Sequence, residues 1–200
     1  MIKIRQFVVL MVALAFFIGC ASSKEGRLKE ALSFPKLPDE SKRLAVTYEF
    51  SSADHVWTER EHPEEIRQIL EDRFVQVLRD SGYFTTIKKG AGSEGEGLHM
   101  KVRLTSTRSP SSIFPEIMTT ITLFAIPSWT RVYLGVKANI ATPNGREEAF
   151  QLTDSITVVR WFPLILITPF RNDENVATKR LMNIYKNLLI QMRDKQLFNP

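Results

Sequence analysis

The sequence has a single cysteine, Cys20, and only three histidines, at positions 55, 62 and 99. One cysteine cannot form a disulfide within the chain, and the histidine spacing fits no helix-borne zinc motif. No Gly-x-Ser-x-Gly elbow is present to hold a serine nucleophile. The apolar run from Phe7 to Ile18 is shorter than the roughly 20 residues that a membrane-spanning helix needs. We therefore expect a non-enzymatic protein with no catalytic residue, no metal and no cofactor.

What the chain does have is a distinctive N-terminus. Lys3 and Arg5 precede the apolar run, and Gly19 and Cys20 follow it. A basic start, a short apolar stretch and a small residue at the cut are the parts of a secretory signal. The residues Phe17-Ile18-Gly19-Cys20 resemble the lipobox of bacterial lipoproteins, with Phe17 in place of the usual leucine. An ordinary secreted protein and an uncleaved N-terminal anchor are the alternatives.

The lipobox resemblance implies a location and a covalent modification. It implies cleavage between Gly19 and Cys20, diacylation of the Cys20 thiol and acylation of the new amino terminus. Ala21 stands where an aspartate is the common inner-membrane retention signal, so an outer-membrane anchor facing the periplasm is implied. Two or more acyl chains anchor a protein stably, whereas one binds only marginally. The first expected partner is therefore the membrane, reached through the lipid on Cys20.

Composition and charge place few further limits on function. We predict a signal peptide at 1–19, a lipidated N-terminus and tether at 20–42, and a single periplasmic domain at 43–200. The formal net charge is +5, but basic residues are spread along the chain without a recognition motif, so no nucleic acid is expected. Gly90-Ala91-Gly92-Ser93-Glu94-Gly95 matches the letters of a dinucleotide fingerprint. An alternating strand pattern follows it instead of a helix, so we expect a loop and no nucleotide.

Periodicity predicts an α+β domain. Alternating apolar residues indicate strands at 44–50, 83–88, 98–105, 131–140 and 146–159, the last two joined by a turn at 142–145. Helical spacing indicates amphipathic helices from Pro63 to Gly82 and from Asp173 to Arg193. We expect a mixed or antiparallel sheet with the two helices packed on one face. Asp154 falls on the inward face of the last strand, where a bulge or sheet rim explains it better than a functional acid does.

The order of the first elements carries a further resemblance. A strand at 44–50, a helix through Phe74 and Leu78 that ends at Ser81-Gly82-Tyr83-Phe84, and a strand at 98–105 follow one another. This pattern resembles the periplasmic domains of the TolB N-terminus, the curli-secretion lipoprotein and penicillin-binding-protein activator lipoproteins. The likeness covers about the first half of the mature chain and carries over no functional residue. It implies a non-enzymatic envelope protein that docks on a partner.

Two uncharged segments, 117–130 and 161–170, flank the predicted hairpin and contain tryptophan and proline. Such segments suit a buried core or a surface that contacts membrane or protein. We take Phe124, Trp129, Trp161 and Phe162 as candidate contact residues. The sequence thus predicts an outer-membrane-anchored periplasmic lipoprotein that acts as a non-catalytic interaction or envelope-assembly module, with an unknown envelope protein as partner. A carrier of lipid or another apolar ligand is the alternative.

Overall fold

A computed structural model describes most of the expected domain and part of the expected tether. The described residues are 28–36, 43–55, 59–91, 97–109, 113–122, 126, 128–160 and 173–198. Gly19, Cys20 and most of the Gly90–Gly95 loop lie outside them. Among the described residues, no helix is both long and apolar enough to cross a membrane.

The described elements are six strands and three helices. The strands are β1 (Leu44–His55), β2 (Glu59–Glu61), β3 (Phe84–Lys89), β4 (Leu98–Arg108), β5 (Ser128–Ala141) and β6 (Glu147–Arg160). The helices are α2 (Glu64–Ser81), α3 (Ile113–Ile121) and α5 (Asp173–Asp194). The strand and helix positions follow the predictions closely, while β2 and α3 were not expected.

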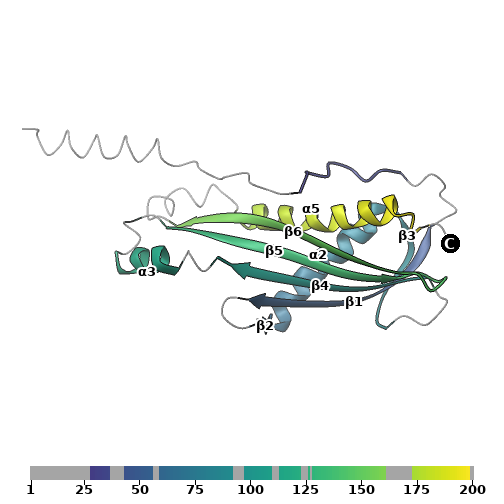
Figure 1. The fold of residues 1–200 in the computed structure, drawn as a ribbon, viewed down its shortest axis with the longest axis horizontal. Coiled ribbons are helices and arrows are strands. Elements are labelled where there is room, and N and C mark those ends of the chain that lie inside the picture. The colour runs from purple at the N-terminus through teal and green to yellow at the C-terminus, as the bar shows by residue number, and fades with distance from the viewer. Residues whose placement is uncertain are drawn as a thin grey trace, which may run out of the picture.

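The strands form one mixed sheet in the order β2-β1-β4-β5-β6 (Figure 1). β1 runs parallel to β4 along one side and parallel to β3 along the start of its other side. β2 pairs antiparallel with the end of β1, beyond β3. β4, β5 and β6 follow one another as antiparallel neighbours. The predicted α+β class with a mixed sheet is confirmed.

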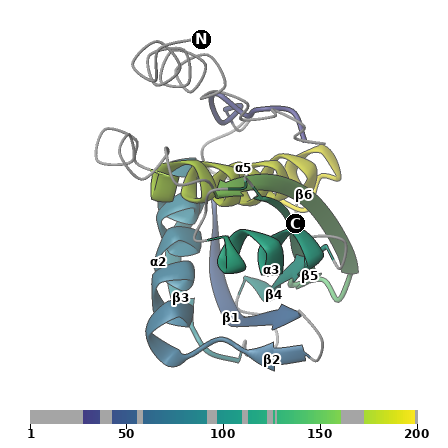
Figure 2. The same ribbon diagram turned by 90° about the vertical axis from the view of Figure 1, so that its left-hand side faces the viewer.

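One face of the sheet carries the core, and α2 and α5 cover it (Figure 2). Strand residues alternate between the two faces, so every second residue is available for burial. The buried strand residues on the covered face include Val46, Tyr48, Phe50, Leu98, Met100, Val102, Leu104, Val136, Ala138, Ile140, Phe150 and Leu152. Phe74 of α2 lies at their centre, with ring centroids 5.2 Å from Tyr185 of α5 and 5.7 Å from Tyr48. The opposite face of the sheet, called here the open face, carries mostly polar side chains.

Helix α2 begins and ends where the sequence predicts, but its apolar stripe is less buried than expected. Pro63 precedes it, Glu64 and Glu65 occupy its first turn, and Gly82 ends it at a φ of 66°. That left-handed conformation suits glycine because other side chains clash there. The expected apolar stripe is only partly buried: Ile66 and Ile69 are exposed. Leu70, one residue after Ile69, does pack against the core cluster, so only part of the stripe in the first half of the helix is left exposed.

The C-terminal tail and the expected tether both pack against the domain. Leu197 and Phe198 belong to the core, and the Phe198 ring lies 5.1 Å from that of Tyr83. This packing was not predicted, because the tail is too short to show a period. Residues 28–36, called here the strap, lie within the predicted tether, and Leu28 and Phe34 pack on the core cluster.

Candidate functional site

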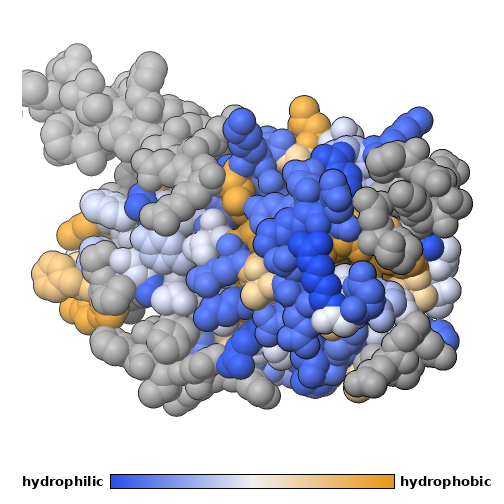
Figure 3. All heavy atoms as spheres, turned by 45° about the vertical axis from the view of Figure 1, so that its right-hand side comes forward, coloured by the Kyte–Doolittle hydropathy of each residue, from blue (hydrophilic) through white to orange (hydrophobic). Residues whose placement is uncertain are grey.

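An apolar surface lies at the end of the sheet where β5 begins and β6 ends. It consists of Phe114, Ile117 and Ile121 of α3, Ile126 of the following turn, and Trp129 and Val159 of the strands; we call these six residues the apolar tip. All six are exposed, with Phe114 at 73%, Ile121 at 70% and Trp129 at 61%. Apolar side chains gather at the left-hand end of the molecule in Figure 3, where Figure 1 places α3.

The position of α3 follows from its sequence and its neighbours. Phe114, Ile117 and Ile121 are spaced as i, i+3 and i+7, so they share one helix face. That face points to solvent, while Ile113 and Met118 on either side of it are partly buried, and α3 contacts β5. The Thr122 hydroxyl donates to the Met118 carbonyl at 2.8 Å and accepts from the Ile126 amide at 3.3 Å. This pair of bonds closes the helix and holds Ile126 beside it.

The strand part of the tip projects beyond the rest of the sheet. β4 ends at Arg108, opposite Val132, whereas β5 and β6 continue as a pair to Ser128 and Arg160. Trp129 and Val159 are direct cross-strand partners on the open face of this extension. These two side chains are therefore exposed because β5 and β6 extend beyond the end of β4.

Basic residues flank the base of the tip. Arg108 ends β4 on the helix-covered face, and Arg131 lies on the open face of β5; both are exposed. Glu116 is the only acidic residue in the sequence between Arg108 and Arg146. Positively charged side chains thus lie next to the apolar tip.

Of the predicted contact residues, Trp129 lies in the tip. Phe124, Trp161 and Phe162 fall outside the described residues, as do the predicted lipidation site Cys20 and the predicted cleavage residue Gly19. Ser128, in the first uncharged segment, pairs with Arg160, whereas the second segment, 161–170, lies outside the described residues. Sequence reasoning missed Phe114 and the helix that carries it, although the i, i+3, i+7 spacing was a signal for them.

Asp154, which the strand pattern places on the inward face, lies on β6 and is 1% exposed. The pairing of β5 with β6 is regular through this position, so the expected bulge is wrong, while β6 does lie at the edge of the sheet order. Its Oδ1 accepts from the Ser155 amide at 2.8 Å, and its Oδ2 lies 3.9 Å from Nη1 of Arg180 on α5. Arg103 is on the opposite face of the sheet, so it does not join this pair.

A second buried carboxylate, Glu71 of α2, also has partners. It accepts from the Tyr48 hydroxyl at 3.0 Å and from Lys89 Nζ at 2.8 Å. Burial, followed by the hydrogen bond to Glu71, raises the pKa of Tyr48 to about 12. The described residues contain no group of three or more His, Cys, Asp or Glu side chains that is able to hold a metal ion.

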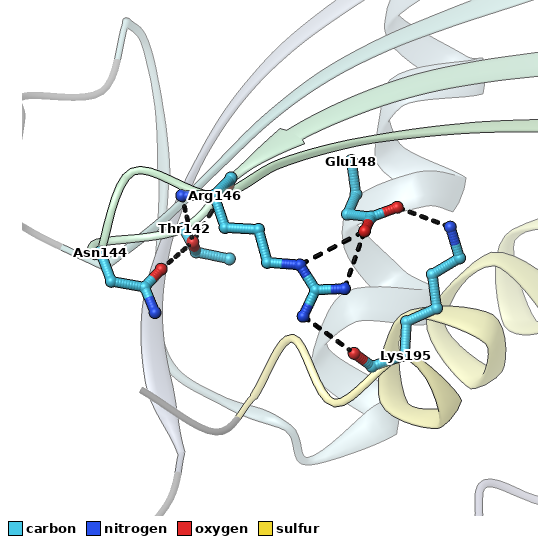
Figure 4. A network of polar contacts seen from close by, with 5 residues as sticks. All are labelled: Thr142, Asn144, Arg146, Glu148 and Lys195. Atoms are coloured by element: carbon cyan, nitrogen blue, oxygen red, sulfur yellow. Dashed lines mark hydrogen bonds and ion pairs between the residues drawn. The ribbon is translucent and has the colours of Figure 1, made fainter.

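The end of the β5–β6 hairpin opposite the tip is charged (Figure 4). Glu148 accepts from Arg146 Nη2 at 2.7 Å and from Lys195 Nζ at 2.5 Å, and these bonds hold the pKa of its carboxyl below the usual value. The Thr142 hydroxyl accepts from the Arg146 amide at 3.1 Å and closes the turn. The long strands therefore join a polar end to an apolar end.

Hydrogen bonds between asparagine side chains of α5 and the backbone of the strap hold the strap on the helix. Asn183 Nδ2 and Asn187 Nδ2 both donate to the Lys29 carbonyl at 3.1 Å, and the Ala31 amide donates to Asn183 Oδ1 at 2.8 Å. These contacts fix the chain at residue 29. The part of the predicted tether from residue 28 to residue 36 is therefore attached to the domain.

Comparison with known proteins gives distant likenesses only. No family model matches the chain, and no curated protein matches it. Among solved structures it is similar to rare lipoprotein B from Shewanella oneidensis, with a TM-score of 0.44 and 12% identity over 76% of this chain and 96% of that one. Protein XCC0632 from Xanthomonas campestris gives 0.42 and 10% over 86% and 90%, and a minor lipoprotein from Acinetobacter baumannii gives 0.36 and 15% over 78% and 91%.

Two of these three neighbours are bacterial lipoproteins by name. All the TM-scores are below 0.5, so the likenesses carry no argument about what this chain does. The resemblance of the first half to TolB, curli-secretion and penicillin-binding-protein activator domains stays a prediction.

Proposed function

We propose that this chain is an outer-membrane-anchored periplasmic lipoprotein that works as a non-catalytic interaction or assembly module, with the apolar tip as its contact surface. The lipobox residues up to Cys20 support the anchor. The observation that carries the contact role is the solvent-facing side of α3, formed by Phe114, Ile117 and Ile121.

The exposed face of α3 has a free-energy consequence. Fully burying a large apolar side chain is worth about 1.5–3 kcal/mol. Phe114, Ile117 and Ile121 are 73%, 52% and 70% exposed, so covering them yields roughly 3–6 kcal/mol. Contiguous apolar patches on a soluble surface mark interaction sites, whereas scattered apolar residues do not. The tip belongs to the first kind because Phe114, Ile117 and Ile121 share one helix face and Trp129 and Val159 are cross-strand partners.

The two buried carboxylates support a non-catalytic role. Asp154 and Glu71 each have a basic neighbour and a hydrogen-bond donor. Both carboxylates are therefore paired within the fold, although Asp154 Oδ2 accepts no hydrogen bond from the described residues and only faces Arg180 at 3.9 Å. The carrier alternative gains no support from the described core, where the Phe74 ring contacts those of Tyr48, Phe50 and Tyr185 between sheet and helices.

The test is co-purification from envelope membranes with the full-length, acylated protein. Phe114→Ser combined with Ile117→Ser is expected to lose crosslinked partners while keeping the fold and the membrane anchor. Ile66→Ser with Ile69→Ser is the matched control, because these residues have the same i, i+3 spacing and similar exposure on α2. Unchanged partners in a folded tip variant would contradict the proposal. Mass spectrometry of the N-terminal peptide checks acylation at Cys20 separately.

A further inference from the structure

We infer that the apolar tip is occupied by the bilayer itself, in its polar–apolar interface, when that bilayer carries anionic lipid. This rests on the proposed function, because it names what the contact surface touches. The inference combines the chemistry of the tip, the charge at its base and the length of chain that joins the domain to Cys20.

The chemistry of the tip is that of an interfacial anchor. Its tryptophan, Trp129, lies at the base of the apolar group, where β5 leaves the sheet, while Phe114 and Ile121 belong to α3 beyond the end of β4. Tryptophan favours the headgroup level of a bilayer and aliphatic or phenyl side chains favour the acyl region. A short amphipathic element with this order of residues dips into one leaflet and does not span.

The charge at the base identifies the lipid. Arg108 and Arg131 lie on opposite faces of the sheet, so a tip inserted in a leaflet brings both guanidinium groups to the headgroups. Arginine pairs well with phosphate oxygens because its planar group donates two parallel hydrogen bonds. Near a membrane surface each basic residue adds to the attraction for anionic lipid, and salt screens this attraction.

The anchor brings the tip within reach. The strap is hydrogen-bonded to α5 from Lys29 onward, and Leu28 packs on the core. Leu28 is only eight positions after Cys20, a distance of at most about 28 Å when the chain is fully extended. An acylated Cys20 therefore holds the domain at the bilayer surface, where an exposed apolar end gains from insertion.

Tryptophan quenching tests the inference in the full-length, acylated protein. Trp57→Phe and Trp161→Phe leave Trp129 as the only tryptophan, and the protein is placed in phosphatidylglycerol vesicles with brominated acyl chains. We expect Trp129 emission to shift to the blue and to be quenched. Phe114→Ser with Ile117→Ser should abolish both effects, whereas Ile66→Ser with Ile69→Ser should change neither. Arg108→Gln with Arg131→Gln, high salt or phosphatidylcholine vesicles should weaken the quenching.

Unquenched Trp129 in the anchored protein would overturn the inference. If tip variants then still lose their crosslinked partners, the proposed function stands with a protein on the tip. If they keep those partners, the proposed function fails as well. Urea unfolding reports whether each variant is folded. Ile121→Trp, made in the variant that carries Trp129→Phe, provides a second probe position. Quenching at neither position refutes insertion whatever the partner result.

Discussion

The prediction that separates a contact surface from a core concerns two phenylalanines. Phe74 is fully buried and its ring contacts those of Tyr48, Phe50 and Tyr185. Phe114 on α3 keeps 73% of its surface exposed. Replacing each by alanine makes the same chemical change in two different environments. The cost of each change therefore measures how much of each ring the fold buries.

The expected free energies differ several-fold. Phe→Ala in a packed core costs about 3–5 kcal/mol, from lost burial and the cavity left behind. Phe114 buries only about a quarter of its side chain, so its loss costs about 0.5 kcal/mol. The higher helix propensity of alanine offsets most of that small cost. We expect Phe74→Ala to destabilise strongly and Phe114→Ala to be nearly neutral.

Urea unfolding followed by far-UV circular dichroism measures both changes. With a slope of about 2 kcal/mol per molar urea, Phe74→Ala lowers the midpoint by about 2 M and Phe114→Ala by less than about 0.3 M. Equal slopes for the three proteins confirm that only stability has changed. If Phe114→Ala lowered the midpoint as much as Phe74→Ala, the α3 face would be core and the reasoning about the tip would fail.

Three further predictions follow from the buried polar contacts. The raised pKa of Tyr48 makes the fold lose about 2–3 kcal/mol as the pH rises from 10 to 12, since tyrosine in the unfolded chain ionises first; Tyr48→Phe should reduce this alkaline loss in urea midpoints. Asn183→Ala removes hydrogen bonds to the strap, so amide exchange at Ala31 should accelerate while exchange in β4 stays slow. Arg180→Met should lower the free energy of unfolding by about 1–2 kcal/mol, because it leaves Asp154 without its basic neighbour. Adding Asp154→Asn should recover part of that loss, so a double-mutant cycle should show that the two effects are not additive.

Periodic elements were predictable from sequence because burial imposes a period. The alternation in 98–105 and 131–140 gave two adjacent strands, and Pro143-Asn144-Gly145 gave the turn after them. The left-handed Gly82 marked the end of α2. In each case a local preference of the residues and the pattern of buried residues indicate the same element, so one sequence is enough to predict it.

Exposure was not predictable, because an apolar period looks the same with or without a packing partner. Ile66 and Ile69 continue the stripe of Phe74 yet face solvent, and Phe114 belongs to a helix whose Pro115 and β-branched residues argue against helix. The docking of the strap depends on Asn183, more than 150 residues later in the chain. Only the three-dimensional fold brings such partners together.

The contrast between the two ends of the β5–β6 pair determines how an anchored molecule orients. Glu148 and Val159 are eleven positions apart on β6, so the charged end and the strand part of the apolar tip are about 37 Å apart. Placing Glu148, Arg146 and Lys195 in a leaflet removes water from charged groups, whereas placing the tip there removes water from apolar ones. If the proposed acylation at Cys20 anchors the chain, the strap brings that attachment point near α5. The apolar end is then the one that gains from contact with the bilayer, so we expect the strands to stand away from the membrane.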